Sequence, residues 1–306
     1  MNAEVKALMP LMPWLGGGDV TVRPLDGGLT NRNYCICRGR DRFVLRIMGK
    51  NSRLLGIDRR AEHACAKAAH AAGIGPEVVA FLPDQGVMVT RFVPGRALDF
   101  EAVQTPAILR RVVASMRRYH ECSNGAGKFS AFETVRHYYA QARKRKVPFP
   151  RNAALALETL ARIEDQCGIP EQVCPCHNDL LPGNLVDDRR KVWILDWEYG
   201  GMGDLFFDLG NLAANNLFDR EQETMLLHFY FGKARAADLR RLRLMRLASD
   251  MREAMWGFMQ MGVSKLDFDY RTYARRHWQR FLESARRAGT SSRQRESHVL
   301  HYNQNL

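Results

Sequence analysis

Three oxygen-bearing side chains near the middle of the chain, Asp179, Asn184 and Asp196, have the types and the spacing that phosphoryl transfer requires. A metal-dependent phosphotransferase needs a carboxylate that accepts the proton of the acceptor hydroxyl, and further oxygen ligands that hold Mg2+ against the phosphates. Asp179 suits the first role. Asn184 and Asp196 suit the second, because hard cations prefer carboxylate and amide oxygens.

The elements around these side chains must bring them to one place. Pro182 and Gly183 predict that residues 179–184 form a turned loop, so that the side chains at its two ends can face one point. Residues 192–195 are apolar and predict a short buried strand, which places Asp196 at its end. The alternative is a chance loop followed by a chance Asp.

The pattern His177-x-Asp179-x-x-x-x-Asn184, followed closely by residues 194–198 with the sequence Ile-Leu-Asp-Trp-Glu, resembles the catalytic signature of the aminoglycoside-phosphotransferase and choline-kinase group. The resemblance covers roughly residues 20–285. It implies an α+β, protein-kinase-like two-lobed fold, with a small antiparallel β-sheet lobe and a larger, mainly helical lobe. It also implies that His177 orients the loop while Asp179 does the chemistry.

The chain has 306 residues, enough for one large domain or two lobes, and a net charge of +13 from 46 basic and 33 acidic residues. Such a charge permits nucleotides, nucleic acid or a membrane surface as partners, although it also suits a plain solvated surface. The densest basic run, residues 143–146, has no glycine and aromatic pattern around it. We therefore expect no nucleic-acid partner.

Seven cysteines are spread irregularly along the chain. Cys35-x-Cys37 and Cys174-x-Cys176 lack the C-x-x-C spacing of structural zinc sites, so we expect no metal there. For Cys176 beside His177 a metal ligand is the alternative, and we favour burial near the catalytic loop. Free thiols fit a reducing compartment and predict a cytoplasmic protein.

The first residues do not have the pattern of a secretory signal. Lys6 is the only early basic residue, and Pro10 and Pro13 interrupt the apolar stretch. No apolar run is long enough to span a bilayer, so we expect no transmembrane segment.

A sheet lobe is predicted for residues 1–92, and a catalytic and acceptor-binding lobe for residues 93–306. Alternating and β-branched patterns predict strands at residues 20–25, 33–37, 41–47, 76–81 and 86–92. A helix is predicted from Asp58, as N-cap, to residue 72. Together these form an antiparallel sheet with one helix, the expected nucleotide-binding lobe.

A polar turn with two glycines follows the first strand. Gly27 and Gly28 allow backbone N–H groups to approach phosphate, although a two-glycine hairpin is common for other reasons. The resemblance extends to a Gly-Gly-x-Thr/Ser-Asn segment, which implies that Thr30 and Asn31 also belong to the nucleotide site.

The resemblance further implies that Arg46 takes the place of the phosphate-binding lysine of protein kinases, with Glu62 as its partner. An arginine can bind phosphate bidentately. The alternatives are an exposed strand charge for Arg46 and a carboxylate favoured by the helix dipole for Glu62. Residues 92–98 suit a linker, and the resemblance implies that backbone groups at Phe92 and Val93 bind adenine.

The remainder of the chain is predicted to be mostly helical, with helices at residues 108–122, 132–146, 153–167, 240–261 and 270–288. Glycines at 200–203 predict a tight, mobile loop, and Asp208 is the expected N-cap of the next helix. The resemblance implies that Asp208 stabilises the catalytic loop, a role compatible with a plain cap.

A small cation with a hydroxyl group is bound by the faces of aromatic rings and by nearby carboxylates. Asp179 and Glu198 supply negative charge, and Tyr199 supplies a ring. The resemblance points to Trp256, beside a glycine, as a wall of a choline pocket. Methionines at helical spacing within residues 251–259 favour the alternative that Trp256 belongs to the core.

Two departures concern the acceptor. Residues 212–216 are neutral where eukaryotic choline and ethanolamine kinases are acidic and rich in aromatic residues, and Met259 replaces a second Trp. Residues 196–199 and the glycines after them resemble the bacterial choline-kinase-like branch more closely. The expected activity is an ATP- and Mg2+-dependent kinase for the hydroxyl of a small alcohol, with choline preferred and ethanolamine next. A thiamine or aminoglycoside kinase and a non-catalytic nucleotide-binding scaffold are the rivals. The sequence leaves the oligomeric state open.

Overall fold

The computed structural model describes residues 3–15, 19–25, 31–49, 51–123, 125–170 and 172–289. The chain forms two compact units, one from Met1–Lys128 and Cys174–Met202, the other from Phe129–Val173 and Gly203–Leu306. These units do not test where one lobe ends and the next begins, so the division between residues 92 and 93 stays a prediction.

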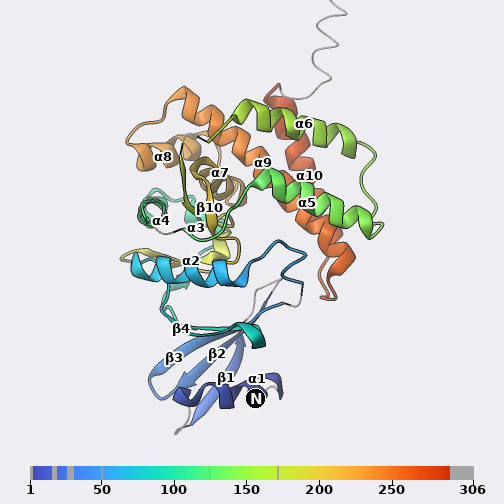
Figure 1. Cartoon of the computed structure of the whole chain (residues 1–306). Helices are drawn as coiled ribbons and strands as arrows, with labels where there is room; N and C mark the ends of the chain where they lie inside the picture. Colours follow the sequence, from blue (N-terminus) through green and yellow to red (C-terminus); the bar gives the residue numbers. More distant parts are fainter. Residues whose placement is uncertain are drawn as a thin grey trace, which may run out of the picture. The chain divides into compact units, whose positions relative to one another are not determined.

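A five-stranded antiparallel sheet opens the first unit, as the strand patterns predict (Figure 1). Its strands are β1 (Val20–Leu25), β2 (Arg32–Arg38), β3 (Asp41–Ile47), β4 (Val78–Leu82) and β5 (Val87–Arg91), in the order β1-β2-β3-β5-β4. Short helices flank them: α1 (Ala3–Leu8), η1 (Met9–Leu11), η2 (Pro13–Leu15) and η3 (Pro83–Gln85).

The two faces of this sheet have different neighbours. The N-terminal helices cover one face and form a core with it: Val5, Met12, Leu15, Tyr34, Ile36, Phe43, Leu45, Ile47, Val87 and Val89. Because successive strand residues point to opposite faces, Arg46 lies on the other face. There it meets α2 (Arg59–Ala71), which contacts β4 (Figure 1).

The predicted cap of α2 is confirmed. The Asp58 side chain accepts hydrogen bonds from the backbone N–H groups of Arg60 at 2.8 Å and Ala61 at 3.2 Å. A carboxylate at this position satisfies N–H groups that have no partner within the helix, and it complements the helix dipole. The cap fixes where α2 begins, and therefore where Glu62, in its first turn, is placed.

The rest of the first unit positions the loop that carries Asp179 and Asn184. Its elements are β6 (Arg96–Ala97), α3 (Phe100–Val103), α4 (Pro106–His120), β7 (Val173–Cys176), η4 (Pro182–Asn184), β8 (Leu185–Asp187) and β9 (Val192–Ile194). β6, β8 and β9 form a three-stranded sheet. Arg111 of α4 holds Asp187 of β8 with two hydrogen bonds of 2.9 and 2.8 Å, and Ile194 N–H donates to the Ile74 carbonyl at 2.8 Å.

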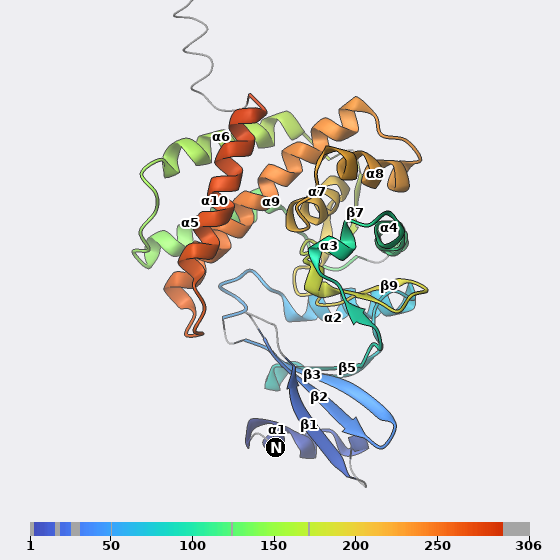
Figure 2. The ribbon, with the colours of Figure 1, turned by 180° about the vertical axis from the view of Figure 1, so that it is seen from behind.

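The second unit is helical. Its helices are α5 (Ala131–Lys144), α6 (Ala153–Cys167), α7 (Leu205–Asn215), α8 (Arg220–Phe231), α9 (Ala236–Val263) and α10 (Tyr270–Arg287). α9 is the longest and contacts each of the other five, and Figure 2 shows α10 crossing it. No described helix has both the length and the apolar character needed to cross a membrane.

Two local predictions are wrong. Residues 201–204 form a strand, β10 (Gly201–Asp204), and not the predicted tight, mobile loop. The N-cap of α7 is Asp204, whose side chain accepts the Phe206 N–H at 2.9 Å, while Asp208 lies inside the helix. Asp204 also forms an ion pair with Arg241 of α9 at 2.7 Å, a contact that the local sequence does not predict.

Candidate active site

Hydrogen bonds to both ring nitrogens fix His177 at the start of the catalytic loop. Nδ1 accepts the Asp179 backbone N–H at 3.2 Å, so Nε2 carries the proton and donates to the Leu195 carbonyl at 2.8 Å. The ring is 1 % exposed and packs 4.6 Å from the buried Trp197 ring. In this geometry His177 holds the loop against the segment that carries Asp196.

The loop turns sharply just before Asp179. Asn178 has a φ of 66°, in the left-handed region that Asn adopts more readily than most residues. Its side-chain amide donates to the Tyr199 carbonyl at 2.9 Å. The turn leaves the Asp179 side chain partly exposed, although its neighbours on both sides are buried.

Asn184 is hydrogen-bonded to the backbone of the two segments that carry Asp179 and Asp196. Its amide nitrogen donates to the Asp179 carbonyl at 2.9 Å, so Oδ1 is the atom that it can offer to a cation. The Leu195 N–H donates to the Asn184 carbonyl at 2.8 Å, which places Asn184 next to the residue before Asp196. Asp196 itself has a φ of 61° and a side chain that is 30 % exposed.

Arg46 is the buried centre of the charge network. Its guanidinium forms ion pairs with Glu62 and with Asp196, through different nitrogens. Burial alone would lower the pKa of Arg46, but the carboxylates of Glu62, Asp196 and Glu198 outweigh burial and raise that pKa above its ordinary value. The predicted pairing of Arg46 with Glu62 is present, and the strand charge is not exposed.

A second arginine, Arg59, was missed by the sequence analysis. It contacts Glu62 at 2.7 Å, Glu198 at 3.2 Å and the Asn31 side-chain oxygen at 3.1 Å. Its position three residues before Glu62 on α2 is a signal that could have found the first contact. Arg46 and Arg59 together face three carboxylates, those of Glu62, Asp196 and Glu198.

Glu198 belongs to this network in the structure. Its carboxylate accepts the Asn31 amide at 2.8 Å and is 5 % exposed as a residue. Burial, together with the nearby Asp196 carboxylate, raises the pKa of Glu198 to about 7, against the opposing effect of Arg59. The Glu198 carboxyl group is therefore partly protonated near neutral pH. Tyr199 follows it in the chain and is also buried.

The other predicted nucleotide residues have varied positions. Gly27, Gly28 and Thr30 lie outside the described residues. Phe92 and Val93 are partly buried; the Phe92 N–H donates to the Arg42 carbonyl at 3.0 Å, and the Arg42 guanidinium lies 4.3 Å from the Phe92 ring centre.

Two predicted residues belong to the second unit. Asp208 is buried within α7. Trp256 on α9 is 7 % exposed, with its ring centre 5.7 Å from that of Tyr270 and 5.5 Å from that of Tyr273. The Tyr273 hydroxyl donates to Glu253 at 2.6 Å. Trp256 therefore lies among aromatic rings, with a carboxylate bound to one of them.

Comparisons with known proteins identify the family of this chain. Residues 21–245 match the phosphotransferase enzyme family. Ethanolamine kinase 2 of Mus musculus is 26 % identical over 305 residues, which cover 90 % of this chain and 78 % of the relative. A choline/ethanolamine kinase family protein from Mesorhizobium loti superposes with a TM-score of 0.76 at 30 % identity, covering 92 % of this chain and 94 % of the other.

Choline kinase LicA from Streptococcus pneumoniae superposes with a TM-score of 0.80 at 20 % identity, covering 92 % of this chain and 99 % of the other, and a LicA structure in complex with AMP also matches. At that identity the likeness shows the fold. The protein-kinase-like α+β fold expected from the sequence is thus confirmed. The chain belongs to the phosphotransferase enzyme family and is a small-molecule phosphotransferase.

Proposed function

We propose that the chain is an ATP- and Mg2+-dependent kinase that phosphorylates the hydroxyl group of a small amino-alcohol, with choline preferred and ethanolamine next. One observation carries the proposal: Arg46 is held between Glu62 and Asp196, while Asn184 is tied beside Asp196 and Asp179. Phosphoryl transfer needs a positive side chain that binds phosphate, oxygen ligands for a metal, and a carboxylate for the acceptor hydroxyl.

Asp179 is the proposed group that orients the acceptor hydroxyl and takes its proton. Its backbone is fixed from two directions, because its N–H donates to His177 and its carbonyl accepts from Asn184. A carboxylate held in place in this way can present one oxygen to a bound alcohol without a cost in ordering at each turnover.

The donor atoms at Asn184 and Asp196 fit Mg2+, because an amide oxygen and a carboxylate are hard ligands of the kind this ion prefers. Bound there, the ion would neutralise charge on the phosphates as it develops. The Asp196 carboxylate now neutralises Arg46. We expect Arg46 to exchange its ion pair with Asp196 for a contact with the phosphates of ATP. The ion pair with Glu62 would hold the Arg46 side chain in place.

The remaining nucleotide contacts are proposed from the family resemblance. Gly27, Gly28 and Thr30 are assigned to the phosphates, with Asn31 at the edge of the Arg59 network. Backbone groups at Phe92 and Val93 are assigned to adenine. The AMP complex of LicA supports an adenine nucleotide as the ligand of this fold.

Trp256 is the proposed wall of the acceptor pocket, since a quaternary ammonium group binds to aromatic faces beside negative charge. Tyr270 and Tyr273 pack against it, and the Tyr273 hydroxyl donates to Glu253, whose carboxylate is also paired with Arg252. Glu198 and Tyr199 are proposed as further acceptor contacts. The names of the relatives include both choline and ethanolamine kinases, which supports an amino-alcohol and leaves the preference for choline as the part to test.

The test is ADP release by the full chain with ATP and Mg2+ against choline, ethanolamine, thiamine, kanamycin and no acceptor. Saturable release with choline above the level without acceptor is the expected result. Release with thiamine or kanamycin alone would overturn the acceptor assignment but keep the reaction. If the chain binds ATP but releases no ADP with any of these acceptors, the alternative of a non-catalytic nucleotide-binding scaffold is favoured.

The second unit contains two buried tryptophans, Trp256 and Trp278, which allow a matched further test. Trp256→Leu should raise the KM for choline by roughly tenfold, because a desolvated cation–π contact is worth about 1–2 kcal/mol. The KM for ATP should stay unchanged. Trp278→Leu removes an equally buried indole that packs on Phe258, and should leave the KM for choline unchanged. Equal effects of the two substitutions would place Trp256 in the core.

A further inference from the structure

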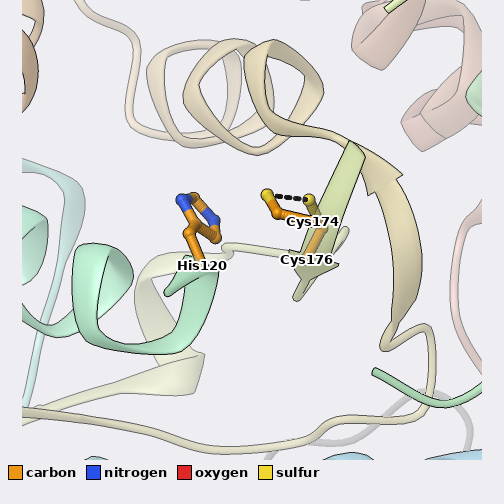
Figure 3. A group of neighbouring side chains, drawn as sticks. All are labelled: His120, Cys174 and Cys176. Carbon is orange, nitrogen blue, oxygen red and sulfur yellow. Dashed lines mark hydrogen bonds between the residues drawn. The ribbon is translucent and has the colours of Figure 1, made fainter. Parts of the chain in front are cut away.

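Three buried side chains of the first unit bring a nitrogen and two sulfur atoms together outside the proposed active site. His120 is the last residue of α4, and Cys174 and Cys176 lie on β7. Their ligand atoms are all within 4.8 Å of one another, and the residues are 4 %, 3 % and 0 % exposed. Figure 3 shows the imidazole of His120 facing the two thiols.

The separation of the sulfur atoms suits a tetrahedral metal. Cys174 Sγ and Cys176 Sγ are 3.7 Å apart. Two zinc–sulfur bonds of about 2.3 Å that meet at a tetrahedral angle place their sulfur atoms ~3.8 Å apart. A disulfide needs the sulfurs at about 2.05 Å, so the observed separation of the sulfur atoms matches two metal ligands and not a disulfide.

The charge of the complex also fits the buried position. Two thiolates and a neutral imidazole around a divalent cation give a net charge of zero, whereas a monovalent cation would leave a buried negative charge. His120 ends α4, where the negative end of the helix dipole favours a cation. Among divalent ions, a set of one nitrogen and two sulfurs is typical of Zn2+.

We propose that His120, Cys174 and Cys176 form a zinc site with three protein ligands. Binding of Zn2+ forms two Zn–S bonds and one Zn–N bond and releases the two thiol protons to solvent, so that affinity rises with pH. The fourth tetrahedral position is left to water. The ion would tie the end of α4 to β7, whose last residue, Cys176, directly precedes the catalytic loop.

The chain contains its own comparison for this proposal. Cys35 and Cys37 have the same spacing on a strand, β2, and their sulfur atoms are 3.8 Å apart. Among the described residues, the only group of three or more His, Cys, Asp or Glu ligand atoms this close together is the one at His120. The proposal therefore predicts zinc at one Cys-x-Cys pair and none at the other.

The test uses the full chain, produced in medium with added Zn2+ because the buried ligands should be loaded during folding. Metal content is measured by mass spectrometry for the wild type, for the double variant C174S/C176S and for the control C35S/C37S. About one equivalent of Zn2+ is expected in the wild type and in C35S/C37S, and none in C174S/C176S. Protein produced with Co2+ should show a thiolate-to-cobalt absorption band in the wild type and in C35S/C37S, and no such band in C174S/C176S.

A second measurement needs no variant. In wild-type protein under mildly denaturing conditions, bound Zn2+ should protect Cys174 and Cys176 from alkylation, and a chelator should make both thiols reactive. The proposal is overturned if zinc content is the same in all three proteins, if the wild type carries no zinc, or if a Cys174–Cys176 disulfide is found. If the wild type contains zinc but the protein produced with Co2+ lacks the thiolate-to-cobalt band, the ion is bound by oxygen ligands, and the proposal is also overturned.

Discussion

Replacing Glu62 by Gln removes one buried negative charge that two arginines share and keeps the shape of the side chain. Glu62 is 0 % exposed and pairs with Arg46 and Arg59. Removing one partner of a buried ion pair typically costs about 3–5 kcal/mol. Arg46 keeps Asp196 and Arg59 keeps Glu198, so the lower end, ~3 kcal/mol, is expected. That is roughly a hundredfold change in the folding equilibrium constant.

Urea denaturation followed by tryptophan fluorescence measures this loss as a lower midpoint with an unchanged slope. The control is Glu77→Gln, which removes a carboxylate that is half exposed and 3.1 Å from Arg91 of β5. Its midpoint should stay nearly unchanged, because exposed ion pairs contribute little. If Glu62→Gln and Glu77→Gln shift the midpoint equally, Glu62 does not organise a buried network.

Two further predictions concern stability. The folded-state pKa of Glu198, about 7 against an ordinary 4.5, means that its contribution to stability is present below pH 4.5 and is lost as the pH rises through 7. In Mg2+-free urea titrations the wild type should therefore lose up to ~3 kcal/mol relative to Glu198→Gln between pH 4.5 and 8, and parallel pH profiles would contradict this. Gly210→Ala should cost about 1–3 kcal/mol, because its Cβ would lie 2.8 Å from the Met245 backbone carbon. Gly183→Ala, which meets nothing within 4 Å, is its control, and equal midpoints would refute the packing argument.

The sheet and the catalytic loop could be predicted because their signals are local. Alternation placed the five strands to within two residues, and Asp58 marked the start of α2. The cap of α7 was assigned wrongly because both Asp204 and Asp208 precede or begin an apolar helix. The local sequence does not determine which of the two carboxylates accepts a hydrogen bond from the first backbone N–H groups of the helix. Asp204 is favoured by its contact with Arg241, which lies 37 residues further along the chain.

The charge network was only half predictable. The family pattern pairs Arg46 with Glu62, but the bonds from Arg59 and Asn31 to Glu198 join segments 139 and 167 residues apart. The sequence analysis placed Asn31 and Glu198 in different sites, and the structure joins them by a hydrogen bond. The His120 cluster was missed for the same reason, since the spacing rule examined only neighbouring cysteines while the third ligand comes from α4.

The proposed reaction is tested most directly by following its products with wild-type protein and Asp179→Asn. Each is incubated with ATP, Mg2+ and choline, phosphorylated alcohol is detected by phosphorus NMR, and ATP binding is measured separately. The wild type should form ADP and the phosphate ester of choline in equal amounts, while the variant binds ATP and forms neither. Normal turnover by Asp179→Asn, or ADP without a phosphate ester from the wild type, would contradict the assignment of Asp179 and of the reaction.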